Sequence, residues 1–106
     1  MDARERYDDL VDFLAFSRDD VTLSQMMGMP CVKRGGKMVA GFSGRLSGMV
    51  FKLPAEAVRA RALALAGAVL FDPSGQGQPF KEWVVIPAAH GELWSEFAQH
   101  AVTPAG

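Results

Sequence analysis

Reactive side chains are sparse in this sequence, which has one cysteine, Cys31, and two histidines, His90 and His100. A cysteine nucleophile needs a nearby cation or histidine to stabilise its thiolate. The neighbours Pro30 and Val32 instead favour a small, buried side chain at Cys31. The two histidines lack the i, i+4 spacing of a helical metal-binding pair. We therefore predict no metal site and no cofactor.

Acidic residues and glycine-rich segments give no catalytic pattern either. Within residues 1–20 the spacing of the aspartates indicates a solvated helix face and the turn after it. These residues are Asp8, Asp9, Asp12, Asp19 and Asp20. An acid–base pair would need two carboxylates in an apolar setting. Residues 74–77 lack the Gly-Lys-Ser/Thr ending of a phosphate loop. We predict that the protein is not an enzyme; an enzyme that uses Cys31 is the alternative, and it requires an exposed, fast-reacting thiol.

Positive charge is concentrated in the middle of the chain. The net charge is −1, yet residues 33–61 hold seven basic side chains against one acidic, and residues 1–32 hold three against seven. One interpretation is that the basic region pairs with the acidic first segment, within one chain or across a dimer. The other is a surface that faces an anion or a nucleic acid. We favour the first, because the pI of about 6.1 is below that of a typical nucleic-acid binder.

Six residues in and after the basic region are candidates for partner or anion binding. They are Lys33, Arg34, Lys37, Lys52, Lys81 and Trp83. Trp83, with Lys81, Lys52 and Arg34 around it, is the best candidate for an exposed polar–aromatic cluster. The alternative is that Trp83 belongs to the core and that the charges solvate a sheet edge.

Methionines gather in the same part of the chain. The set is Met26, Met27, Met29, Met38 and Met49. Alternate positions of a strand must face the covering helices, so we favour core packing for them. Since methionine adapts to irregular partners, a dimer interface or a shallow ligand groove is the alternative.

A glycine pair indicates the element that positions these residues. Gly35-Gly36 separates two runs of alternating apolar and polar residues, and both central positions of a primed turn need the positive φ that glycine adopts freely. The sequence therefore predicts a hairpin here. The four strands of the predicted antiparallel meander are 21–26, 31–34, 37–42 and 48–53.

Two details of the meander follow from residue types. In the last strand Met49, Phe51 and Leu53 share one face, because successive side chains alternate. Pro30 has no N–H for a ladder, so we expect a bulge or sharp bend at Gly28-Met29-Pro30. A looser link over residues 43–47 joins the third strand to the fourth.

The first predicted helix starts at Asp2, with Glu5 three residues on as in a capping box. Its core face follows helical spacing. That face consists of Tyr7, Leu10, Val11 and Leu14, with Phe13 and Phe16 widening it. The segment 18–20 is the predicted turn that leads out of the helix.

Two more helices and two strands follow the meander. Pro54 suits the first turn of a helix and Gly67 suits its end, with Arg59 and Arg61 solvated. The last helix is predicted to bury Leu93, Trp94, Phe97, Ala98 and Ala101. Strands are predicted at 68–71 and 81–86, joined by a flexible loop over 72–79.

These elements give the order α-β4-α-β2-α, which predicts an α+β fold with two layers, helices packed on an antiparallel sheet. The 106 residues suffice for one domain, 1–106. No apolar run approaches the ~20 residues that span a bilayer. With no signal peptide and one cysteine, we expect a cytoplasmic protein that makes no membrane contact.

Four runs in the sequence match a known pattern. They are Met26-Met27-Gly28, Gly-Lys-Met-Val-Ala-Gly at 36–41, Val-Phe-Lys-Leu-Pro at 50–54, and Lys-Glu-Trp-Val-Val-Ile-Pro at 81–87. Together they resemble the N-terminal domain of the TfoX/Sxy family, over residues 21–102. That family has a methionine–aromatic–glycine motif, where this chain has Met27 in place of the more common phenylalanine. The segment Met29-Pro30-Cys31 also departs from the family pattern.

The resemblance implies an α+β domain that is often dimeric. It also implies a link to bacterial regulation of natural competence, in which full-length members with a second, helical domain act as transcriptional co-activators. We expect a stand-alone TfoX N-terminal-like domain that forms a homodimer and has a regulatory protein partner. The same runs are similar to the YjbR/MmcQ group, whose fold is similar to double-wing DNA-binding domains. Nucleic-acid binding through the Gly35-Gly36 hairpin is therefore the alternative.

Overall fold

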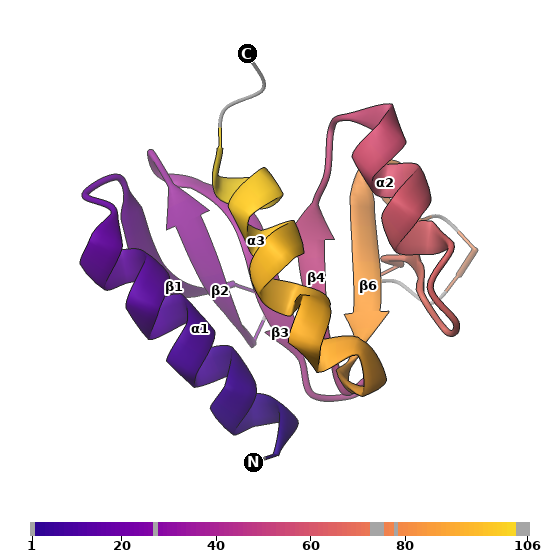
Figure 1. Ribbon diagram of the computed structural model, residues 1–106, viewed down its shortest axis with the longest axis horizontal. Coiled ribbons are helices and arrows are strands. Elements are labelled where there is room, and N and C mark those ends of the chain that lie inside the picture. The colour runs from indigo at the N-terminus through magenta and orange to yellow at the C-terminus, as the bar shows by residue number, and fades with distance from the viewer. Residues whose placement is uncertain (1, 27, 73–75, 78, 104–106) are drawn as a thin grey trace.

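In the computed structural model, which describes residues 2–26, 28–72, 76–77 and 79–103, three α-helices pack on one face of a six-stranded antiparallel sheet (Figure 1). The elements in chain order are α1 (Ala3–Ser17), β1 (Val21–Met26), β2 (Met29–Arg34), β3 (Lys37–Ser43), β4 (Gly48–Lys52), α2 (Glu56–Leu63), β5 (Val69–Leu70), β6 (Trp83–Pro87), the 3-10 helix η1 (Ala88–Leu93) and α3 (Trp94–Val102). The strands lie in the order β1-β2-β3-β4-β6-β5. The predicted α+β class, with helices on an antiparallel sheet, is confirmed.

The glycine hairpin forms as predicted. Arg34 lies opposite Lys37 across a two-residue turn, and Gly35 and Gly36 have φ values of 58° and 83°. A residue with a side chain would be strained at either of these positive φ values, whereas glycine adopts them freely. The two glycines therefore favour a tight two-residue turn.

The bend expected at Gly28-Met29-Pro30 is displaced. Met26 pairs with Met29, so the chain turns just before Met29, with Gly28 at a φ of 75°. Pro30 is a regular member of β2. The register between β2 and β3 begins only at Cys31, so the missing N–H of Pro30 interrupts no β2–β3 pair.

A β-bulge in β3 moves Met38 to the other side of the sheet. Val32 lies opposite Ala40 and Lys33 lies opposite Met38, so Val39 is an extra residue in β3. Val39 and Ala40 both join the core under the helices. Strict alternation from Ala40 would put Met38 there as well, but the bulge turns Met38 to the face opposite the helices, which we call the far face. Lys33 lies on the same face, because it follows the core residue Val32 in β2.

Helix α1 begins at its predicted cap. The Asp2 carboxylate accepts a hydrogen bond from the Glu5 N–H at 2.8 Å, and this bond holds the pKa of Asp2 below its usual value. Tyr7, Val11 and Leu14 are buried against the sheet, which confirms the centre of the predicted core face.

The prediction that Phe13 and Phe16 widen this core face is wrong. Their exposed fractions are 60% and 90%. Phe16 follows Tyr7 by nine positions, a rotation of about 180° at ~100° per residue, so it points away from the sheet. The outer side of α1 therefore carries two exposed phenylalanines.

Helix α2 is shorter than predicted at both ends. It begins at Glu56 rather than at Pro54, and it ends at Leu63, although Gly67 does have a positive φ of 83°. The start is delayed because Leu53, directly after β4, is still held in an extended pairing: its N–H donates to the Glu82 carbonyl oxygen, directly before β6, at 2.8 Å.

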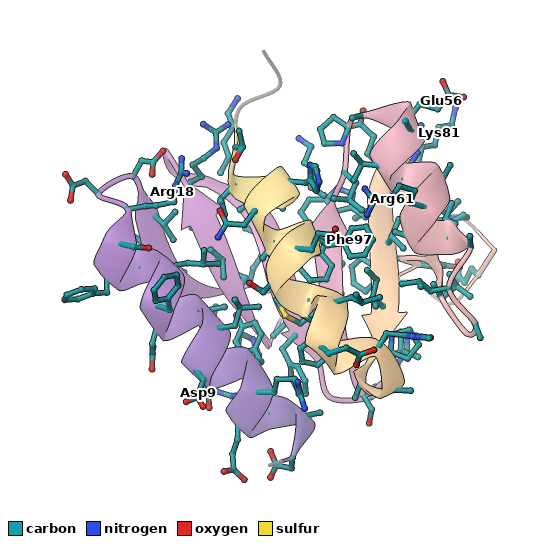
Figure 2. All side chains as sticks on the ribbon, viewed as in Figure 1. Asp9, Arg18, Glu56, Arg61, Lys81 and Phe97 are labelled. Carbon is teal, nitrogen blue, oxygen red and sulfur yellow. The ribbon has the colours of Figure 1, made fainter. Side chains whose placement is uncertain are left out.

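Two arginines of α2 differ in their surroundings. Arg59 is half-buried rather than solvated as predicted, because its guanidinium donates to the carbonyl oxygens of Leu53 and Pro54 at 3.0 and 3.2 Å. Arg61 stays exposed but joins α2 to α3: it pairs with Glu96 at 2.8 Å and lies 5.5 Å from the ring centre of Phe97 (Figure 2).

The last third of the chain completes the core. Four of the predicted α3 core residues are buried: Trp94, Phe97, Ala98 and Ala101. The rings of Phe97 and Phe51 lie 6.4 Å apart, which packs α3 on β4. The alternation predicted for β4 is confirmed, since Met49 and Phe51 lie in this core while Val50 lies in a smaller cluster with Val85.

Candidate binding surface

Three of the six predicted site residues surround one hollow at the end of the sheet. Arg34 and Lys37 flank the glycine turn, and Lys52 ends β4. The hollow has a volume of about 160 Å³. Its other lining residues are Met38, Val39, Pro54, Ala101 and Thr103. We call this hollow the basic depression.

The Arg34 guanidinium is incompletely satisfied within the described part of the chain. Its Nε is buried and has no hydrogen-bond partner there. The pKa of Asp20 is lowered first by its hydrogen bond from Arg18, at 3.3 Å, and only weakly by the charge of Arg34. A buried donor without an acceptor costs about 1–3 kcal/mol. The depression therefore suits a group that supplies an acceptor oxygen.

The other predicted residues lie outside this hollow. Lys33 lies opposite Met38 on the far face, and Trp83 lies opposite Lys52. Lys81 is exposed in the turn before β6, at the α2 end of the molecule (Figure 2). The polar–aromatic cluster predicted around Trp83 thus forms only in part, because Lys81 is directed elsewhere.

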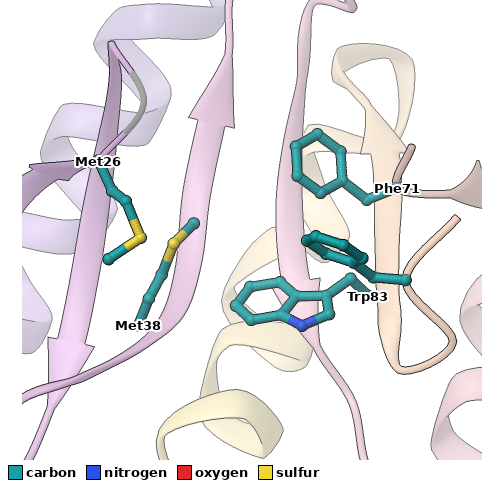
Figure 3. A pocket seen from close by; sticks show the side chains of 5 residues that line it. Met26, Met38, Phe71 and Trp83 are labelled. Carbon is teal, nitrogen blue, oxygen red and sulfur yellow. The ribbon is translucent and has the colours of Figure 1, made fainter. Parts of the chain in front are cut away.

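Apolar side chains form a second hollow, on the far face (Figure 3). Met26 and Met38 line one side, and Phe71, Phe80 and Trp83 line the other, around a volume of about 110 Å³. The rings of Phe71 and Phe80 meet edge to face, with 6.2 Å between their centres. The Phe80 N–H also donates to the Phe71 carbonyl oxygen at 2.8 Å. We call this hollow the methionine groove.

Gly41 gives the methionines their room. A Cβ atom at Gly41 would lie 3.0 Å from Met29 Cε and 3.1 Å from Met38 Cε. The two thioether side chains therefore lie directly over the backbone of β3 at this glycine. Any larger residue would displace them and change the shape of the far face.

The two hollows adjoin each other. Met38 lines both, and Lys52 of the basic depression is the cross-strand neighbour of Trp83 in the methionine groove. Lys33, on β2, is the cross-strand neighbour of Met38 on β3. The result is one surface with an apolar centre and a margin of positive charge.

The predicted methionine cluster is divided between core and surface. Met49 is fully buried, in agreement with the favoured core packing, whereas Met26 and Met38 line the groove. Met29 is half-buried on the far face, and Met27 lies outside the described residues. Phe80 belongs to the site although no sequence pattern marks it, because the chain returns there onto Phe71.

The candidate nucleophile is enclosed. Cys31 is buried, as predicted, and burial raises the pKa of its thiol, against smaller opposing effects of Lys33 and Ser24. His90 Nε2 lies 2.8 Å from the Ala66 carbonyl oxygen and is engaged there. Within the described residues, no group of three histidine, cysteine or carboxylate side chains is placed to hold a metal ion.

No protein-family model, curated protein or solved structure matches this chain. Among the helices of the described residues, none has both the length and the apolar character needed to cross a bilayer. The resemblance to the TfoX/Sxy family stays a hypothesis, and the two adjoining hollows are the basis for a function.

Proposed function

We propose that this chain is a non-enzymatic interaction domain that binds another protein through the far face of its sheet. The methionine groove is the observation that supports this most. Met26 and Phe80 expose 38% and 45% of their surface beside the half-buried Met38 and Trp83. Large apolar side chains gathered in a hollow with a charged margin are typical of protein interaction sites. The regulatory role that the TfoX resemblance implies belongs to this proposal.

The margin of the groove defines the partner further. Lys33 and Lys52 stand on either side of Met38 and carry no ion pair within the described residues. A partner that presents apolar side chains beside carboxylates satisfies both the groove and its margin, and charge of this kind sets orientation and association rate. Methionine side chains adapt to such a contact.

Site-specific photocrosslinking in the source cell tests the proposal. A benzophenone amino acid replaces Met26, which is exposed and lines the groove; the control replaces Leu46, which is 40% exposed outside it. We expect protein adducts at position 26 and none at position 46. Equal labelling at the two positions, or no adduct at either, would overturn the proposal.

Nucleic-acid binding is the second candidate, and the basic depression favours it. Arg34, Lys37 and Lys52 converge on one hollow, and the buried Arg34 Nε has no acceptor in the described structure. A phosphate group would supply that acceptor and neutralise the charges. The glycine turn that carries Arg34 and Lys37 would act as the wing.

Fluorescence anisotropy with duplex DNA separates this candidate from the first. A phosphate binder loses affinity steeply as salt rises. The variant Lys37→Glu with Lys52→Glu should abolish the binding, whereas Lys81→Glu, outside the depression, should leave it unchanged. If the wild-type protein does not bind duplex DNA at low salt, this candidate is removed.

A further inference from the structure

Helix α1 presents an exposed stripe with carboxylates at one end and aromatic rings at the other. Asp9, Asp12, Phe13 and Phe16 follow the i, i+3, i+4, i+7 pattern of a single helix face. All four are exposed, and Phe16 is the most exposed large apolar residue among those described. Figure 2 shows Asp9 on the outer side of α1. We call this set the α1 stripe.

The α1 stripe has no internal partner that explains it. The ion pair that α1 makes within the described residues joins Arg4 to Asp8, away from the stripe. Two phenylalanines held in water on one helix face are unfavourable and mark a contact surface. Their carboxylate neighbours Asp9 and Asp12 indicate that the surface on the other side is basic.

We infer that the α1 stripe of one copy of this chain docks into the methionine groove of a second copy. The inference rests on the proposed function of the far face and names its partner. The α1 stripe has its two carboxylates at one end and its two aromatic rings at the other. The apolar methionine groove likewise has Lys33 and Lys52 beside its residues Met38 and Trp83, so rings can meet the groove while carboxylates meet the lysines.

The dimensions agree with this contact. The α1 stripe spans about 10.5 Å from Asp9 to Phe16, at 1.5 Å per residue. Lys33 and Lys52 stand on β2 and β4, which are separated by β3, so their backbones lie about 9.6 Å apart at ~4.8 Å per strand. Asp9 and Asp12 lie about 4.5 Å apart along the helix axis. The long side chains of the two lysines can close the remaining distance to these carboxylates while Phe13 and Phe16 lie over the groove.

The contact is head to tail rather than two-fold. The α1 stripe lies on the helix side of the sheet, and the methionine groove lies on the far face. A two-fold dimer uses the same patch on both copies, whereas this contact uses two different patches. A bound pair therefore still offers one free groove on one copy and one free stripe on the other, and association continues or closes as a ring.

A pair of complementary variants tests this directly. The stripe variant carries Phe13→Ser and Phe16→Ser, and the groove variant carries Lys33→Glu and Lys52→Glu. Light scattering and sedimentation velocity should show wild-type masses that rise with concentration above the 11.4 kDa of one chain. Each variant alone should stay at one chain. An equimolar mixture should form a species of two chains and no larger one, because one intact stripe meets one intact groove.

Controls and contrary outcomes are defined by the same design. Two control variants alter exposed residues outside both patches: one carries Leu46→Ser, and the other carries Arg45→Glu together with Lys81→Glu. Both control proteins should associate like the wild type. Circular dichroism checks that every variant is folded. Variants that do not pair when mixed would overturn the inference, and a variant that dimerises alone would indicate a two-fold contact through its intact patch. A wild-type protein that stays monomeric would also overturn it. If the wild-type protein stays monomeric but position 26 crosslinks to other proteins, the inferred self-association is wrong, whereas the proposed function of the far face is supported.

Discussion

The indole Nε1 of Trp94 donates a hydrogen bond to the main-chain oxygen of Ile86 at 3.0 Å, and both residues are fully buried. This bond fixes the first turn of α3 to β6. It also gives a large aromatic residue a polar anchor in an otherwise apolar core.

Replacement of Trp94 by Phe should therefore destabilise the fold. The substitution removes the donor and leaves the Ile86 oxygen short of a partner, a loss of about 1–3 kcal/mol. Urea unfolding followed by circular dichroism measures it. Trp83→Phe, in the half-buried methionine groove, is the matched control and should cost less; equal losses would contradict this assignment.

Gly48→Ala should destabilise through a backbone clash. A Cβ atom there would lie 2.7 Å from the Ile86 oxygen and 3.2 Å from the Cα of Pro87, and a strand backbone cannot rotate away. We expect a loss of about 1–3 kcal/mol. Gly44→Ala is the control, since the nearest atom to its Cβ is 4.0 Å away, in Phe42. Similar unfolding midpoints for the two variants would refute the clash.

Tyr7 should make stability fall at alkaline pH. Burial raises the pKa of its phenol, with a smaller effect from Cys31, so the folded protein keeps the proton when the unfolded chain loses it near pH 10.0. Unfolding then releases a proton, and the stability present below this pH declines as pH rises. Urea midpoints should fall more steeply above that pH in the wild type than in Tyr7→Phe. Parallel curves would be evidence against the shift.

Cys31 should react slowly in the folded protein. The thiol is buried and its pKa is raised, so little thiolate is available to iodoacetamide at neutral pH. Mass spectrometry should show slow labelling in buffer and rapid labelling in concentrated urea. Rapid labelling in buffer would restore the hypothesis of a cysteine enzyme.

Local chemistry made much of the sheet predictable. Gly35-Gly36 favours a primed turn, because both residues can adopt a positive φ. The alternation of Met49 and Phe51 shows which face of β4 packs in the core. Asp2 likewise marks the start of α1. In each case a residue and its immediate neighbours decide the conformation, so the sequence alone suffices.

The candidate site was less predictable because it depends on distant neighbours. The bulge at Val39 leaves no periodic signal, yet it alone brings Met38 to the groove. Phe80 becomes part of the site by a return of the chain onto Phe71. The outward direction of Phe16 follows from helix geometry, but a run of apolar residues with Phe13 obscures it.

The position of β6 between β4 and β5 affects how the chain is made. In the sheet Lys52 pairs with Trp83 and Gly48 pairs with Pro87. The edge of β4 that faces β6 therefore stays unpaired until most of the protein has been synthesised. The first three hairpin-linked strands can assemble on the ribosome from local contacts, but the core side of β4 stays uncovered until α3 emerges. Vectorial synthesis thus leaves the apolar side chains of β4, Met49 and Phe51, exposed in the growing chain until its last helix is made.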